Sequence, residues 1–232
     1  MPFTNQVALV LGAGRGVGRE AALALGAAGA FVACFDFSPM HAERTAQAIV
    51  AAGGRAKAYS GDVVKKIAFQ TMVNAISDDY GEERMDVLVS AVDVAPKAHL
   101  LRLDEWDWHR ALDSNLTLPF LAAQVAGRIM QAQGGGTMVF FGAQPDQPDS
   151  VAYQAGKQGL LALARHAARV LAAAHIRVHL IWPDDGTAPP EAVSFAEAAQ
   201  AVGEAAPPTS PGEMARWLAE HPDANGWVLR TS

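Results

Sequence analysis

The stretch VALVLGAGRGVGREAALALGAAGAFVACFD, residues 7–36, contains a strand, a glycine-rich turn, a helix and a second strand. The runs 7–11 and 31–36 are short and almost wholly apolar, which is typical of buried parallel strands. The segment 16–29 between them is rich in Ala and Leu at helical spacing. A glycine turn placed directly after the first strand of such a unit predicts a dinucleotide-binding site.

The rest of the chain continues the alternation of strand and helix, without an internal linker. Strands are predicted at 7–11, 31–36, 56–60, 86–90, 137–141, 177–181 and 227–230, and helices near 16–29, 39–53, 64–80, 104–133, 151–174 and 211–220. This pattern predicts an α/β, Rossmann-like doubly wound fold: a seven-stranded parallel sheet with helices on both faces.

Composition limits the class of protein. With 232 residues, half of them hydrophobic, we expect one NAD(P)-binding domain over 1–232. The net charge of −6 and the absence of a Lys/Arg block predict no nucleic-acid partner, and no apolar run is long enough to predict a membrane partner. The single cysteine, Cys34, is expected in a buried strand, which favours a cytoplasmic protein without disulfides. The histidines lack ligand spacing, so no metal site is predicted.

The glycine turn provides the candidate cofactor site. Gly12, Gly16 and Gly18 allow a tight turn and a close approach of the backbone to a pyrophosphate at the helix N-terminus. Asp36 ends the second strand, where a carboxylate would accept hydrogen bonds from the adenosine ribose and repel a 2′-phosphate. This favours NAD. Arg15 is the counter-argument, since a guanidinium could pair with that phosphate and so favour NADP.

Tyr153 and Lys157 form the candidate catalytic pair. Their spacing of four residues in a helical segment places both side chains on one face, one turn apart. A nearby ammonium lowers the pKa of a phenol, so Tyr153 could exchange a proton with a carbonyl or alcohol oxygen. The spacing also occurs by chance in long helices, so the prediction depends on the rest of the chain.

With these motifs, the chain resembles the short-chain dehydrogenase/reductase family from about Gln6 to Arg230. The glycine loop is similar to the family's TGxxxGxG, with Leu11 where Thr is usual. The other matching motifs are the adenine-contacting pair Asp62-Val63, Trp106 and Asn115 in the long helix that carries the family's active-site Asn, and the YxxxK of Tyr153 and Lys157.

The resemblance implies an NAD(P)-dependent oxidoreductase that transfers hydride between the nicotinamide and a ketone or secondary alcohol. Tyr153 would be the general acid/base, Lys157 would bind the nicotinamide ribose, and Asn115 would hold a water that links Lys157 to solvent. The helices near 104–133 and 151–174 would form a homodimer or homotetramer. The implied cofactor contacts are Gly12, Arg15, Gly16, Val17, Gly18, Asp36, Asp62, Val63, Ala91, Tyr153, Lys157 and Pro183.

The chain departs from the family pattern in three loops. The catalytic serine after the fifth strand is missing, because Gly142 and Ala143 occupy its place; our hypothesis is that the amide of Gln144 donates instead. The usual NNAG is SAVD, which puts Asp93 where Gly is expected, and the usual Pro-Gly is Pro183-Asp184. These departures favour the alternative of a catalytically impaired dinucleotide-binding protein that acts as a sensor or assembly partner.

The segment 184–211 differs in composition from the rest of the chain, with proline-rich ends around an Ala-rich stretch. Two interpretations stay open: a lid over the substrate, or a poorly ordered surface loop. The aromatic side chains of Phe140, Phe141, Trp182 and Phe195 are expected to give the substrate pocket an apolar lining.

Overall fold

The computed structural model of the chain describes residues 1–142, 150–183, 188–202, 208, 210–221 and 225–231. One parallel sheet runs through it, with the strand order β3-β2-β1-β4-β5-β6-β8-β7. The strands are β1 (Val7–Leu11), β2 (Phe31–Phe35), β3 (Arg55–Tyr59), β4 (Val87–Ser90), β5 (Gly136–Phe141), β6 (Ile176–Pro183), β7 (Val193–Ser194) and β8 (Val228–Thr231).

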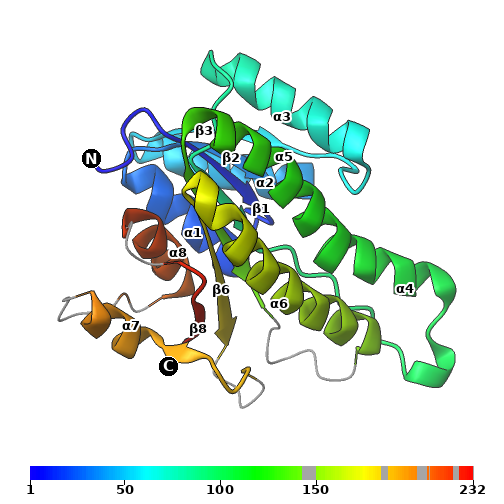
Figure 1. Cartoon of the computed structure of the whole chain (residues 1–232). Coiled ribbons are helices and arrows are strands. Elements are labelled where there is room, and N and C mark those ends of the chain that lie inside the picture. The colour runs from blue at the N-terminus through cyan, green and yellow to red at the C-terminus, as the bar shows by residue number, and fades with distance from the viewer. Residues whose placement is uncertain (143–149, 184–187, 203–207, 209, 222–224, 232) are drawn as a thin grey trace.

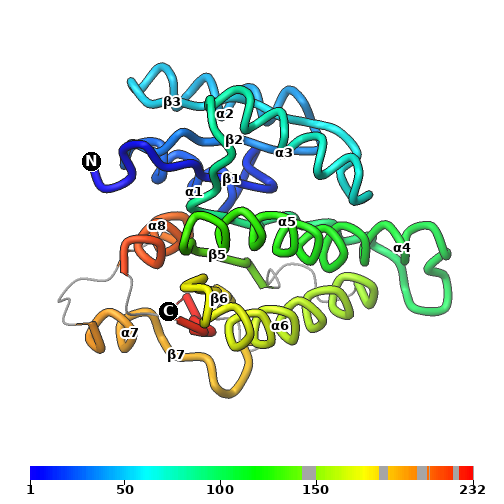
Figure 2. The backbone as a smooth tube through the Cα atoms, turned by 45° about the horizontal axis from the view of Figure 1, so that its top comes forward, coloured from blue at the N-terminus to red at the C-terminus, as the bar shows by residue number. Residues whose placement is uncertain are grey.

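Helices cover both faces of this sheet, as Figures 1 and 2 show. They are α1 (Gly16–Ala27), α2 (Pro39–Ala51), α3 (Lys66–Tyr80), α4 (Glu105–Leu112), α5 (Leu118–Gln133), α6 (Val151–Leu171), α7 (Phe195–Ala201) and α8 (Pro211–Glu220). Side chains alternate along each strand, so each face has its own core. Val7, Leu9 and Leu11 pack with α3, α5 and α6, whereas Ala8 and Val10 pack with α1, α2, α7 and α8.

The α/β doubly wound fold is confirmed, but the predicted number of strands is wrong. The sheet has eight strands instead of seven, because β7 pairs in parallel with β8 through Val193 and Leu229. A strand of two residues has no periodicity, and it lies inside the segment 184–211. The described part of that segment therefore contains an edge strand followed directly by helix α7.

The predicted continuous helix over 104–133 is interrupted. A π turn over Asp113–Thr117 separates α4 from α5. Pro119, in the first turn of α5, has no N–H to donate to the carbonyl of Asn115 four residues earlier. The interruption falls at Asn115, so the local geometry there is not that of a regular helix.

The strand order reverses between β1 and β4, the two central neighbours from which the sheet grows outward on either side. At such a switch point, the loops after the two strands diverge, and ligands bind at the carboxyl ends. Among the described residues, no helix combines the length and hydropathy that a membrane span requires. Cys34 is fully buried in β2, as predicted, and burial raises the pKa of its thiol to about 12.

Candidate active site

The turn after β1 requires glycine at several positions, including Gly12 and Gly18. Gly12 has φ +82°, and a Cβ there would lie 2.7 Å from the carbonyl oxygen of Ala91. At Gly18, a Cβ would lie 2.2 Å from the carbonyl oxygen of Gly12. The glycines thus bring the β1 turn against both α1 and the loop after β4.

The N-terminus of α1 is open to a ligand. Its N-cap residue, Arg15, makes no side-chain cap, and its first turn carries no acidic residue. The free N–H groups and the positive end of the helix dipole are therefore available to an anion such as a pyrophosphate. Arg15 itself is exposed beside them.

A cleft of about 650 Å³ lies at this turn. Asp36 lines it, and its carboxylate accepts hydrogen bonds from the N–H groups of Gly14 (3.0 Å) and Ser38 (2.9 Å). Each carboxylate oxygen keeps a further lone pair for a ribose hydroxyl. The full lining is Gly12, Arg15, Gly16, Val17, Glu20, Asp36, Phe37, Ser38, His41, Ala91, Val92, Asp93, Val94 and Arg110.

A second cleft of about 640 Å³ adjoins the first and shares Phe37, Val94 and Arg110 with it. Asp62 lines this second cleft, as expected for a residue near the adenine. The side chain of Val63 is buried in the core and lines neither cleft. The structure thus puts Asp62 at the surface of the site, whereas Val63 could contribute only its backbone.

Tyr153 and Lys157 lie on the buried face of α6, and each is at most 1% exposed. The ammonium of Lys157 lies 5.5 Å from the centre of the Tyr153 ring. It donates to the carbonyl oxygens of Val92 (3.0 Å) and Phe141 (3.2 Å) and pairs with Asp93 at 3.1 Å. Burial lowers the pKa of Lys157, and the carboxylate of Asp93 opposes this shift.

Asn115 is fully buried in the π turn and joins it to the loop after β4. Its amide nitrogen donates to the carbonyls of Val94 (2.7 Å) and Ala111 (2.9 Å), and its amide oxygen accepts from the N–H of Val94 (3.2 Å). Gly156 allows α6 to approach, since a Cβ there would lie 3.0 Å from the Cβ of Asn115. Asn115 therefore fixes the loop that carries Asp93 beside Lys157.

One of the two positions predicted for the missing serine, Gly142, has no room for a side chain. A Cβ at Gly142 would lie 2.3 Å from the indole of Trp182, which is fully buried at the end of β6. The indole occupies the space that a side chain at Gly142 would need. Ala143 and Gln144 lie outside the described residues, as does Asp184.

The structure gathers half of the predicted cofactor residues in the first cleft, namely Gly12, Arg15, Gly16, Val17, Asp36 and Ala91. Gly18 is buried against Gly12 and supports the turn without lining the cleft. Pro183 ends β6, paired in register with Thr231. Sequence analysis assigned no role to Ser38, His41 and Arg110, which line the same cleft. For Asp93, the sequence offered one indication of a role at the site, namely an aspartate where the family pattern has glycine.

The expected apolar lining of the substrate pocket needs correction at Phe141 and Phe195, whose side chains both belong to the core on the face covered by α1, α7 and α8. The side chain of Phe195 is buried against Trp217, with ring centres 5.0 Å apart. Tyr153 belongs to the core on the other face of the sheet. Phe141 and Phe195 are therefore packing residues.

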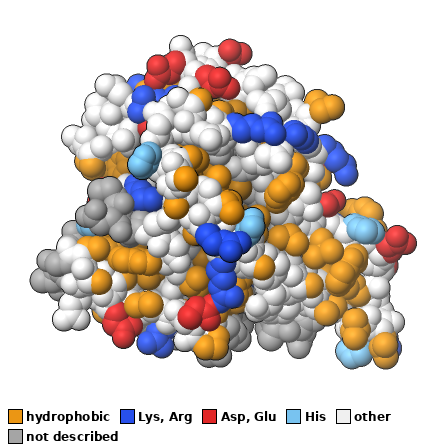
Figure 3. Space-filling view, in the orientation of Figure 1, with side chains coloured by type: hydrophobic (Ala, Val, Ile, Leu, Met, Phe, Trp, Pro, Cys, Tyr) orange, Lys and Arg blue, Asp and Glu red, His pale blue; other side chains and the backbone are white. Residues whose placement is uncertain are grey.

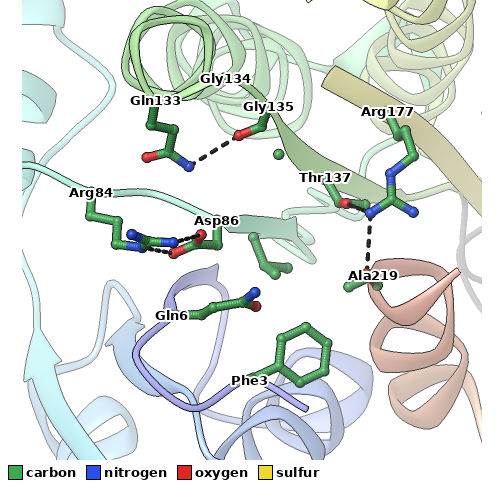
Figure 4. Close-up of a pocket in the computed structure, with 12 residues that line it drawn as sticks. Phe3, Gln6, Arg84, Asp86, Gln133, Gly134, Gly135, Thr137, Arg177 and Ala219 are labelled. Atoms are coloured by element: carbon green, nitrogen blue, oxygen red, sulfur yellow. Dashed lines mark hydrogen bonds and ion pairs between the residues drawn. The ribbon is translucent and has the colours of Figure 1, made fainter. Parts of the chain in front are cut away.

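A polar hollow of about 280 Å³ lies at the amino ends of the strands and is shown in Figure 4. Its polar groups bind one another: Arg84 pairs with Asp86 through two hydrogen bonds, and Arg177 donates to Thr137 and to the carbonyl of Ala219. These contacts join β5 and β6 to the end of α8. The hydrogen bonds around the hollow therefore stabilise the fold at the edge of the sheet opposite the glycine turn.

Comparison with known proteins agrees with this architecture. The chain is 34% identical over 238 residues to a cis-4-hydroxycyclohexanecarboxylate dehydrogenase of Sinomonas cyclohexanicum, covering 98% of this chain and 93% of that protein. It is 31% identical over 185 residues to a 3-oxoacyl-[acyl-carrier-protein] reductase of Synechocystis sp., covering 78% and 74% of the two chains. The crystal structure of a metagenomic short-chain oxidoreductase in complex with NADP superposes with a TM-score of 0.82, at 25% identity, over 100% of this chain and 99% of that one.

The match to the sequence model of a whole family gives the strongest evidence for the family of this chain. The sequence model of the short chain dehydrogenase family matches residues 6–189, which include the glycine turn, Asn115 and the Tyr153–Lys157 pair. The match thus covers the larger part of the chain and every described strand and helix from β1 to β6. This chain belongs to the short chain dehydrogenase family of oxidoreductases.

Proposed function

We propose that this protein is an NAD-dependent oxidoreductase that interconverts a secondary alcohol and its ketone. The observation that carries the proposal is the buried Tyr153–Lys157 pair, held next to a cleft that begins at a glycine turn. Buried titratable pairs at the edge of a cofactor cleft are typical of proton-transfer sites.

The described residues fit a nicotinamide dinucleotide. The glycine turn and the uncapped N-terminus of α1 would hold the pyrophosphate, Asp36 the adenosine ribose, and Asp62 the adenine side. Arg15, Gly16, Val17 and Ala91 would line the same path. When bound, the cofactor supplies or accepts the hydride.

The protein's own part would be proton transfer. Tyr153 would give its phenolic proton to a carbonyl oxygen or take one from an alcohol oxygen. The positive charge of Lys157 would stabilise the phenolate, and Asn115 would keep the loop after β4 in place against Lys157.

NAD is proposed over NADP because Asp36 would repel a 2′-phosphate. Arg15 and His41 line the same cleft, and the dissociation constants of the two cofactors test the preference. We expect a lower dissociation constant for NAD than for NADP, and tighter NADP binding would reverse the assignment. Asp36→Asn should narrow the difference because it removes the repelling charge.

A second function is supported by two observations at the site. Trp182 covers Gly142, and the three donors of Lys157 are already engaged with the protein. Both favour a protein that binds the dinucleotide without turning over substrate, as a sensor or assembly partner. The two functions differ in turnover and share cofactor binding.

The test combines binding with a panel of ketones and secondary alcohols. Because of the full-length relative, the panel should begin with cis-4-hydroxycyclohexanecarboxylate and related cyclic alcohols. NAD binding with turnover that is lost in Tyr153→Phe and kept in the control Tyr80→Phe would support the oxidoreductase. NAD binding without turnover across the panel would support the second function.

We also propose a homodimer or homotetramer formed through α4, α5 and α6. Figure 3 shows hydrophobic side chains over these helices. Trp106 on α4, Phe120 on α5 and Val170 on α6 are 67%, 45% and 50% exposed. Side chains of this size are commonly covered in an assembly when they cluster.

A further inference from the structure

Lys157 has no donor left for a ligand in this conformation. An ammonium group has three N–H donors. The acceptors at Lys157 are likewise three: the carbonyls of Val92 and Phe141 and the carboxylate of Asp93, all within 3.2 Å. A ribose hydroxyl could bind this ammonium only if one of these contacts were broken, and two of them are to backbone held in or next to the sheet.

Asp93, unlike Lys157, has hydrogen-bonding positions left for a ligand. Its side chain is 31% exposed and lines the cofactor cleft, and a carboxylate offers about four lone pairs on its two oxygens. Within the described part of the chain, its recorded contact is the one to Lys157 through Oδ1. The remaining acceptor positions face a cleft that is lined further along by Gly12, Arg15 and Asp36.

Two carboxylates of the cleft, those of Asp36 and Asp93, occupy comparable places. Asp36 follows β2, Asp93 follows β4, and the glycine turn after β1 lies between these strands in the sheet. A dinucleotide whose pyrophosphate binds at the turn has one ribose on each side. Asp36 is the acceptor for the adenosine ribose, and the second ribose then reaches the loop that carries Asp93.

We propose that Asp93 is a cofactor ligand whose carboxylate accepts hydrogen bonds from the hydroxyls of the nicotinamide ribose, in place of donation from Lys157. The inference rests on the proposed dinucleotide function and deepens it. Lys157 acts behind Asp93: its charge offsets that of the carboxylate, and its contact sets the position of Oδ1. Asn115 holds Val94, the next residue, and so keeps the loop in register.

Binding of three ligands distinguishes a role of Asp93 in binding the nicotinamide ribose from a role in holding the whole cleft together. ADP contains only the adenosine ribose, ADP-ribose adds the second ribose, and NAD adds the nicotinamide. Calorimetric titration of Asp93→Asn should give dissociation constants for NAD and ADP-ribose that are roughly 10- to 100-fold higher than in the wild type, the range for a lost charged hydrogen bond. Its constant for ADP should stay within about twofold, because its sites at the turn and at Asp36 are unchanged.

Asp36→Asn is the matched control, since it should weaken all three ligands alike. Equal weakening of ADP in Asp93→Asn would overturn the inference, because the variant would then have disturbed the whole cleft. Unchanged binding of ADP-ribose would overturn it too. Tighter NAD binding would also contradict it, by showing that Asp93 withholds Lys157 from the ribose. If the wild type bound none of the ligands, the proposed function would fail, and the inference with it.

Discussion

Asp93 changes what Lys157 can do, and this pair shows how much of the site is decided by single side chains. The ammonium of Lys157 keeps its distance of 5.5 Å from the Tyr153 ring, so it can still act on the phenol. Its hydrogen bonds, however, all go to the protein. Electrostatic support for Tyr153 and binding of the ribose are therefore separable at this site, although one lysine is expected to provide both in the family pattern.

Gln144 carries a prediction at the same scale. If its amide replaces the missing serine hydroxyl, Gln144→Ala should lower turnover by about 10²–10³, the usual effect of losing one such donor. NAD affinity should be kept. Gln147→Ala, three residues further along the chain, is the control. Steady-state rates that are equal in the two variants would remove Gln144 from the mechanism.

His179 makes the stability dependent on pH. It is buried on β6 beside Trp227, and neither ring nitrogen has a hydrogen-bond partner among the described residues. Burial, with a smaller effect of Arg177, lowers its pKa from 6.5 to about 3. The unfolded chain therefore binds a proton that the folded chain excludes between these values. The contribution of neutral His179 to the free energy of unfolding is therefore present above pH 6.5 and is lost as the pH decreases towards 3.

The expected loss from His179 is about 1.4 kcal/mol per pH unit in that window, or about 2 kcal/mol between pH 7 and pH 5. Urea unfolding at the two pH values measures it. His179→Phe, which keeps an aromatic ring beside Trp227, should lose about 2 kcal/mol less over the same interval. An identical loss in both proteins would show that His179 is not the group responsible.

At the scale of elements, the ends of β5 and β6 determine what the loop after β5 can hold. Trp182 lies over Gly142, so the absence of a side chain at this position is part of a packing arrangement between two strands. Similarly, Pro119 at the start of α5 interrupts the long helix at Asn115, and the resulting π turn directs the amide of Asn115 to Val94. The bare backbone at Gly142 and the π turn at Asn115 are thus both explained by residues of neighbouring elements.

A serine introduced at Gly142 should therefore clash with Trp182. We expect Gly142→Ser to lower the free energy of unfolding by about 1–3 kcal/mol, since it overpacks a buried indole. It should not raise turnover. Gly127→Ala, where a Cβ would meet Met138 at 3.4 Å in a helix, should be neutral or stabilising. Chemical denaturation of the two variants decides, and a fully stable Gly142→Ser would show that Trp182 can move aside.

At the scale of the whole molecule, the order of the strands in the sheet determines where the cleft lies. The strand order reverses at β1 and β4, and the cofactor cleft lies where the loops after these strands diverge. The second group of polar residues, around Arg84 and Arg177, lies at the amino ends and joins elements together. The role of the segment 184–211 as a lid stays a prediction. Its described part contributes an edge strand and α7.

The proposed assembly gives a prediction at this scale. Phe120→Glu on α5 should shift the protein to a smaller species in light scattering coupled to size exclusion, because a charge would have to be buried in the interface. Ile67→Glu is the control: it is 83% exposed on α3, outside the proposed interface. Wild type and Phe120→Glu of the same mass would contradict an interface through α5.

The sequence by itself determined the fold class, because continuous apolar strands and helical periodicity are local patterns that specify a parallel sheet between helices. It also indicated Gly12, Asp36 and the Tyr153–Lys157 pair, whose chemistry follows from residue type and spacing. Only the tertiary structure decided that β7 joins the sheet, that Trp182 leaves no room for a side chain at Gly142, and that Asp93 binds Lys157. These are contacts between segments distant in the chain, and no local pattern encodes which side chains meet when the strands come together.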